Sequence, residues 1–137
     1  MLDGGGNQGF GGYGVGRVNV ITGHNNLLVV GGDFTTLGGS GNNCDYIGEV
    51  NSHTAPSGSQ TFSEYGNGVN NIVYALNSTN GYLFVGGLFT FVDNNIYNYE
   101  YLATHSGGTW SYVGGSGNTF NGGVYTIMNT AFYPHLF

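Results

Sequence analysis

The stretch "NSTNGYLFVGGLFT" at residues 77–90 has a close counterpart earlier in the chain, "GHNNLLVVGGDFT" at residues 23–35. Aligning the two "VGG" triplets places Gly31 on Gly86, and the match extends to both sides of the triplets. The flanking matched pairs are Val18 with Val73, Leu28 with Leu83, Phe34 with Phe89, and Tyr46 with Tyr101. The chain is therefore built from a repeated unit, and this repeat limits the folds that it can adopt.

The repeat continues beyond these two stretches. "TFSEYG" at residues 61–66 matches "TWSYVG" at 109–114, and a third copy opens with "GVYTIMNTAFYPHLF" at 123–137. We expect one incomplete domain, divided into a glycine-rich segment at 1–13, a first repeat at 14–67, a second repeat at 68–122 and a partial third repeat at 123–137.

The composition of each repeat predicts strands. A period of about 50 residues is typical of solenoids and propellers, and the 28 glycines argue against long helical repeats. Runs rich in Val, Ile, Tyr, Phe and Thr, bounded by Gly, Asn or Ser, indicate four short strands per repeat. These runs are 18–21, 27–31, 45–50 and 60–65, then 72–76, 82–86, 99–104 and 109–113. The predicted fold class is all-β, with propeller-like blades of four short antiparallel strands.

Two short sequence motifs predict local backbone conformation. Asn80-Gly81 suits a two-residue hairpin turn with positive φ at both positions. The glycine pairs after the second strands suit positive φ and close backbone approach, with the next phenylalanine filling the core between adjacent sheets. The resulting repeat motif is Val30, Gly31, Gly32 and Phe34 in one copy and Val85, Gly86, Gly87 and Phe89 in the other. A phosphate-cradling loop is disfavoured, because neither copy has the lysine or the helix start that such loops use.

The order of these elements resembles the blades of kelch-like β-propellers, especially those that read "LYVGGxFT" followed by a tryptophan strand. The resemblance covers residues 14–137 and implies a propeller, of a kind that occurs in bacterial surface proteins and in proteins of large DNA viruses. One departure concerns the third strand, where such blades read "A-x-W-D" and this chain has "IGEVNSH" and "LATHSGG".

Charge excludes two classes of partner. The chain has one lysine or arginine against seven carboxylates, for a formal net charge of −6. Nucleic-acid binding needs several cationic side chains on the phosphates, so we expect no nucleic-acid partner. The longest apolar runs, such as "LLVV" at 27–30, fall far short of a membrane span, so we expect no membrane insertion either.

The reactive side chains do not combine into a catalytic or metal-binding pattern. Cys44 is the single cysteine and is expected on a strand as a small side chain. His24, His53, His105 and His135 lack the spacing of metal ligands and are expected to be solvated, and the Asp93–Asn95 stretch is expected to make local turn hydrogen bonds. We therefore predict no enzyme activity and no cofactor.

The aromatic side chains allow two interpretations. Trp110 and Tyr112, with neighbouring tyrosines and Asn-rich loops, could form a platform on which sugars stack. Trp110 is equally the counterpart of Phe62, which favours packing between blades, and we prefer this reading. Asn77-Ser78-Thr79 has the pattern of a glycosylation acceptor and is expected on the predicted hairpin tip.

We predict from these features a non-enzymatic structural or assembly protein, exposed on the surface of a particle (a virion) or cell. Two repeats and part of a third do not close a ring, so the terminal strands should meet another copy or a protein partner. The interface candidates are Val18 and Val20 at one end and Val124, Ile127, Leu136 and Phe137 at the other. The alternative is a glycan-binding, lectin-like module.

Overall fold

The structure, a computed structural model, describes residues 16–37, 43–50, 61–113 and 120–128. These residues form eight β-strands and no helix, so the all-β prediction is confirmed. Correspondingly, no helix in these ranges is long and apolar enough to cross a lipid bilayer. The strands are β1 (Arg17–His24), β2 (Leu27–Asp33), β3 (Ile47–Val50), β4 (Phe62–Glu64), β5 (Val73–Thr79), β6 (Tyr82–Gly87), β7 (Leu102–Ser106) and β8 (Thr109–Tyr112).

The strands form two four-stranded antiparallel sheets, each with its strands in chain order. Sheet 1 is β1-β2-β3-β4 and sheet 2 is β5-β6-β7-β8. The third strand of each sheet begins later than predicted, directly after Tyr46 (φ 65°) and Tyr101 (φ 70°). A positive φ at a bulky residue interrupts an extended strand, which explains the shorter β3 and β7.

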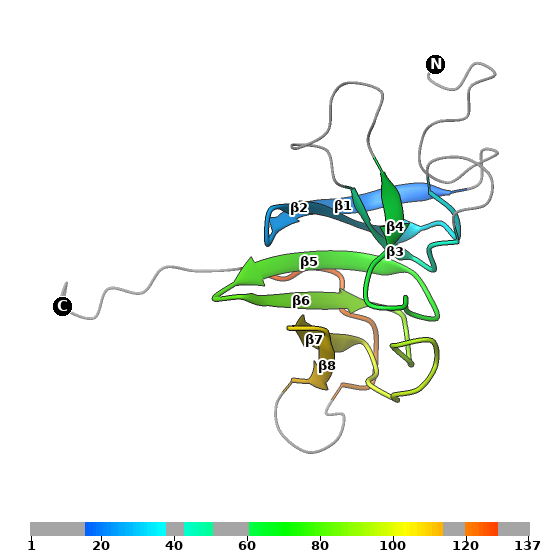
Figure 1. Ribbon diagram of the computed structural model, residues 1–137. Coiled ribbons are helices and arrows are strands. Elements are labelled where there is room, and N and C mark those ends of the chain that lie inside the picture. Colours follow the sequence, from blue (N-terminus) through cyan, green and yellow to red (C-terminus); the bar gives the residue numbers. More distant parts are fainter. Residues whose placement is uncertain (1–15, 38–42, 51–60, 114–119, 129–137) are drawn as a thin grey trace, which may run out of the picture.

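Tight turns connect the first two strands of each sheet. Asn80 has φ 53° and Gly81 has φ 83°, so the predicted hairpin turn with two positive φ values is confirmed. In sheet 1 the same turn is made by Asn25 (φ 49°) and Asn26 (φ 64°). Asparagine tolerates this conformation better than other non-glycine residues. Figure 1 shows both turns at the left, at the opposite end of the sheets from the longer connections between β4 and β5 and between β6 and β7.

The two glycine pairs lie inside β2 and β6 and have no positive φ, so this part of the prediction was wrong. Their role is close approach. A Cβ atom on Gly31 would overlap Val73, and a Cβ atom on Gly86 would lie 2.7 Å from Val124 Cγ1. Hydrogen in place of a side chain at these positions therefore lets the next part of the chain pack directly on the strand.

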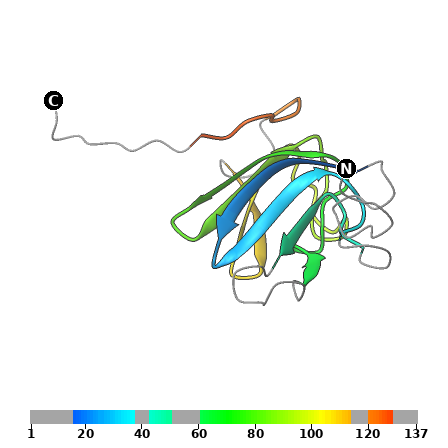
Figure 2. The same ribbon diagram turned by 90° about the horizontal axis from the view of Figure 1, so that it is seen from above.

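The two sheets pack face to face. β5 lies next to β1 and β2 in Figure 1, and Figure 2 shows the hairpins β1–β2 and β5–β6 running in the same direction. Side chains from both sheets form the main core between them, in a cluster that consists of Val29, Ile47, Tyr65, Val69, Val73, Leu76, Leu83, Val85, Phe89, Val92, Ala103 and Trp110. A smaller cluster of Val30, Phe34, Leu37 and Cys44 lies on the other side of sheet 1.

Candidate functional site

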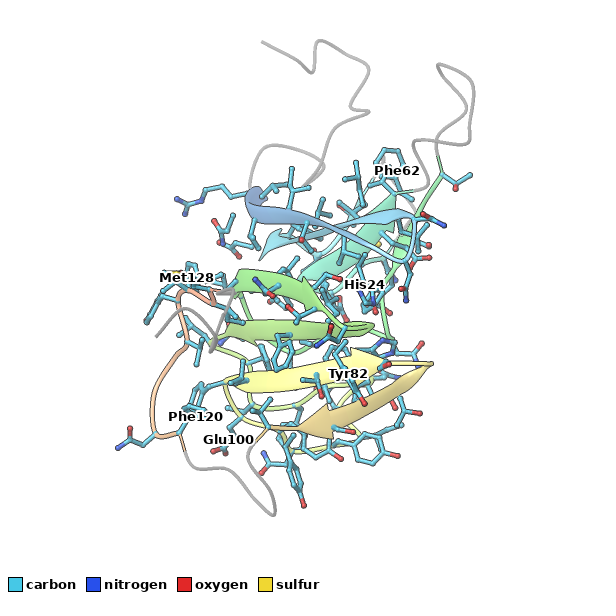
Figure 3. All side chains as sticks on the ribbon, turned by 90° about the vertical axis from the view of Figure 1, so that its left-hand side faces the viewer. His24, Phe62, Tyr82, Glu100, Phe120 and Met128 are labelled. Carbon is cyan, nitrogen blue, oxygen red and sulfur yellow. The ribbon has the colours of Figure 1, made fainter. Side chains whose placement is uncertain are left out.

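Residues 120–128 cover part of the far side of sheet 2, here called its outer face. Val124 packs against Gly86 as Val73 packs against Gly31, and the amide of Val124 donates a hydrogen bond of 3.0 Å to the carbonyl oxygen of Gly87. Figure 3 shows this segment running along sheet 2 between Phe120 and Met128. It contains no strand, although it repeats the contact through which β5 joins sheet 1.

The outer face of sheet 1, which turns away from sheet 2, carries exposed apolar side chains. Ile21 is 55% exposed and Leu28 is 39% exposed, and both lie on the same side as Val30. Their counterparts in sheet 2 are Leu76 and Leu83, which are 7% and 0% exposed because sheet 1 covers them. The outer face of sheet 1 is therefore the same kind of surface as the one that sheet 2 buries against its neighbour.

The two motif phenylalanines differ in their surroundings. Phe89 is 0% exposed within the core between the sheets. Phe34 is 2% exposed but packs with Leu37 and Cys44 on the outer face of sheet 1, where the described residues place no further sheet. Phe89 alone of the two thus lies between two sheets in the described part of the chain.

The residues predicted to form the terminal interfaces do not all lie on the outer faces of the sheets. Val18 packs against the cluster on the outer face of sheet 1, whereas Val20 packs against the core between the sheets. Val20 is therefore covered by sheet 2 within the chain itself. Leu136 and Phe137 lie outside the described residues, whereas Val124 and Ile127 lie on the outer face of sheet 2, both close to Gly86.

Two histidines are buried between the sheets, which corrects the expectation that they are solvated. His24 is 3% exposed and shares a hydrogen bond of 2.7 Å with Ser78 Oγ; Figure 3 shows it at the level where the sheets meet. His105 is 8% exposed and shares a hydrogen bond of 2.8 Å with the Tyr65 hydroxyl. Both occupy strand positions that point into the interface. His53 and His135 lie outside the described residues.

Trp110 completes this buried aromatic cluster. It is 4% exposed, its indole N–H donates to the Gly66 carbonyl oxygen at 2.7 Å, and its ring lies edge-on to His105 at 5.0 Å. The ring is therefore not accessible as a sugar platform. Tyr112 is 37% exposed and contacts Tyr99 edge-on, with the ring centroids 4.9 Å apart.

Burial keeps these groups neutral. Desolvation lowers the pKa of His24 and of His105, and the neighbouring His24 lowers that of His105 further. Desolvation and then Glu49 raise the pKa of Tyr65 to about 12. The cluster therefore holds the two sheets together through neutral hydrogen bonds, and it offers no charged acid or base at neutral pH.

We expect the stability of the fold to decrease as the pH falls below about 6.5, the ordinary histidine pKa. Because the folded pKa values are lower, the unfolded chain binds protons first, with a limiting slope of about 1.4 kcal/mol per pH unit for each histidine. The charge of Asp93 opposes the lowering of the His105 pKa. Burial raises the pKa of Glu64, so at lower pH its protonation favours the folded state and opposes the effect of the histidines on stability. Urea unfolding between pH 7.5 and 5.5 measures the effect, and His105→Asn should flatten the curve. An equal slope in the variant would contradict the assignment.

Cys44 is buried in the connection between β2 and β3. The prediction that it lies on a strand was therefore wrong. Desolvation and then the carboxylate of Glu64 raise its pKa to about 12. A thiol in this state is a poor nucleophile and a poor metal ligand. In the described ranges, no group of three or more His, Cys, Asp or Glu side chains could hold a metal ion.

A polar pocket of about 260 Å³ lies at the end of the sheets that carries the long connections. It is lined by Thr35, Asp45, Tyr46, Asn67, Gly68, Val69, Asn70, Asn94 and Asn95. Three connections meet here, namely those between β2 and β3, between β4 and β5, and between β6 and β7. The pocket is thus formed by both repeats, from residues that are far apart in the sequence.

Hydrogen bonds fix the shape of this pocket. The Asn67 carboxamide donates to Asp93 Oδ1 at 2.7 Å, a bond between two connections and not the local turn hydrogen bond expected for the Asp93–Asn95 stretch. The Asn94 amide donates to the Asn67 carbonyl oxygen at 2.9 Å. The Asp45 amide donates to Glu64 Oε2 at 2.7 Å. These bonds use the carboxylates of Asp93 and Glu64, whereas the carboxylate of Asp45 has no hydrogen bond to a described residue.

Asn77 lies within β5 and not at the hairpin tip, which is made by Asn80 and Gly81. Its side-chain oxygen accepts a hydrogen bond of 2.6 Å from the Thr79 hydroxyl. It also lines a hollow of about 180 Å³ on the outer face of sheet 2, beside Phe84, Ile127 and Met128.

The described residues therefore define a class of structure, two packed four-stranded antiparallel sheets with exposed apolar side chains on the outer face of sheet 1 and a polar pocket at the end that carries the long connections. Comparisons of the chain with protein-family models, with curated proteins and with solved structures give no match.

Proposed function

We propose that the protein is a non-enzymatic structural protein whose sheets are blades of a propeller-like array, and that copies associate head to tail through the outer faces. The observation that carries this proposal is the exposure of Ile21 and Leu28 at positions whose counterparts, Leu76 and Leu83, are buried between the sheets. Ile21 and Leu28 lie on the paired strands β1 and β2 and on one face, and neighbouring exposed apolar side chains of this kind favour a surface that another chain covers.

The contact between the two sheets is a template for the contact between copies. Within the chain, the face of sheet 1 that carries Gly31 receives β5. The equivalent face of sheet 2 carries Gly86 and has only residues 120–128 on it in the described part of the chain. The outer faces are therefore complementary to each other and not to themselves, which favours a head-to-tail contact that repeats around a ring or along a stack.

A structural role fits the state of the reactive groups. The Cys44 thiol and the two interface histidines are buried and neutral. The carboxylates of Glu64 and Asp93 accept hydrogen bonds from Asp45 and Asn67, and these bonds hold the connections between strands in place. Exposure on a particle or cell surface fits a chain with a single lysine or arginine, Arg17, and a sequence rich in asparagine and glycine. These features support a protein that is held by shape and apolar contact, with a protein partner or its own copies.

Replacing Ile21 by glutamate tests the proposal. A buried charge without a partner is strongly unfavourable, so Ile21→Glu should weaken self-association at least tenfold while leaving the fold intact, because Ile21 is exposed in the single chain. Ile96→Glu is the matched control, since Ile96 is 64% exposed in the connection between β6 and β7. Sedimentation velocity over a range of micromolar concentrations measures the association, and circular dichroism checks the fold.

A wild-type chain that stays monomeric and well folded over that range would contradict self-association. Equal association of the wild type and Ile21→Glu would show that the outer face of sheet 1 is not the interface. If only Ile96→Glu weakened the association, the contact would lie at the connection between β6 and β7 and not on the outer face of sheet 1.

A further inference from the structure

The polar pocket at the connection end is independent of the proposed assembly faces. It is framed by Asn67, Gly68, Asn94 and other residues of three connections, whereas the outer faces lie on the strands. Its existence is therefore not explained by head-to-tail contact.

Several polar groups in the pocket have no partner among the described residues. These are the carboxylate of Asp45, the carboxamides of Asn94 and Asn95, and the hydroxyl of Thr35. The backbone that carries them is held in place, because the amide of Asp93 donates to the Gly68 carbonyl oxygen and that of Asn94 to the Asn67 carbonyl oxygen. These side chains are exposed to solvent, so their donors and acceptors are available on a fixed frame to a polar ligand.

The charge of the pocket selects among polar ligands. No cationic side chain lines it, and Asp45 is its one charged residue, so an anionic ligand would be repelled. Glu64 and Asp93 do not line the pocket, and no group of three or more His, Cys, Asp or Glu side chains in the described ranges could hold a metal ion, so a cation would meet a single lining carboxylate. One carboxylate among several carboxamides is better suited to hydroxyl groups, which both donate and accept.

The size of the pocket is consistent with one sugar ring. Its volume of about 260 Å³ lies just below the usual range for drug-sized ligands. Tyr46 and Val69 supply apolar contact surface beside the polar groups, as the C–H faces of a sugar need. We propose that this pocket binds one unit of a neutral saccharide, with its hydroxyl groups on Asp45, Asn94 and Asn95.

The test is an NMR titration of the ¹⁵N-labelled full chain with glucose, galactose, mannose, fucose and N-acetylglucosamine, each at millimolar concentrations. We expect at least one sugar to shift the amide signals of Tyr46, Asn94 and Asn95 in a saturable way. Asp45→Asn removes the charge and Asn94→Gly removes a carboxamide while tolerating φ 54°, and each should weaken binding at least tenfold.

Asn80→Gly is the matched control, because it makes the same change at a positive-φ asparagine in the β5–β6 turn, outside the pocket. It should leave the sugar affinity unchanged. The proposal is overturned if no sugar shifts these signals, or if Asp45→Asn and Asn94→Gly bind as the wild type does. Shifts caused only by Ca²⁺ or only by a lysine-containing peptide would likewise overturn it and assign the pocket to a cation.

Discussion

Truncating Phe89 to alanine is expected to lower the free energy of unfolding by about 3–5 kcal/mol, as for other fully buried phenylalanines. Phe89 is 0% exposed in the core between the sheets, so its loss removes contacts to both sheets and leaves a cavity that neither can fill. Phe34→Ala should fall in the same range, because Phe34 is 2% exposed in its own cluster. Urea unfolding followed by tryptophan fluorescence measures both values.

Tyr82→Ala serves as the control for these truncations. Tyr82 is an aromatic residue of β6 that is 50% exposed, so its removal should cost less than about 1 kcal/mol. Losses near zero for both phenylalanines would show that the repeated motif decorates the surface and does not build the core.

Adding a methyl group at Gly87 is expected to cost about 3 kcal/mol, at the upper end of the range for overpacking. A Cβ atom there would overlap the backbone carbonyl oxygen of Ile72, and a backbone atom cannot rotate aside as a side chain can. The strand β5 would have to move away from β6 at the point where their register shifts, between Val73 and Ala75. Thermal or urea unfolding of Gly87→Ala measures this loss.

Gly23→Ala is the matched control, because a Cβ atom at Gly23 meets nothing within 4 Å. Alanine in place of a strand glycine should then raise stability by about 0.5–1 kcal/mol through the lower entropy of the unfolded chain. Equal effects of the two substitutions would show that close approach is not the reason for glycine at position 87.

The sequence by itself determined the local elements of this protein. Runs rich in Val, Ile, Tyr, Phe and Thr between Gly, Asn or Ser breaks marked eight strands, and Asn80-Gly81 specified its turn, because strand preference and turn conformation depend on neighbouring residues. The repeat also indicated that the two sheets are equivalent, since matched residues occupy matched strands. The glycine pairs were understood only in part, because the steric reason for them lies in Val73 and Val124, outside their own strands.

The tertiary structure alone decided which side chains meet. His24 was expected in solvent because it falls at a strand end or in a loop and lacks the spacing of a metal ligand. It continues the alternation of Val20 and Thr22 and points into the interface, a signal that becomes decisive only when sheet 2 is present. His105 and Tyr65 come from different repeats, and the pocket joins Asp45 to Asn94 across the boundary between them. Such contacts depend on how the two sheets pack, and packing is a property of the whole chain that no local pattern contains.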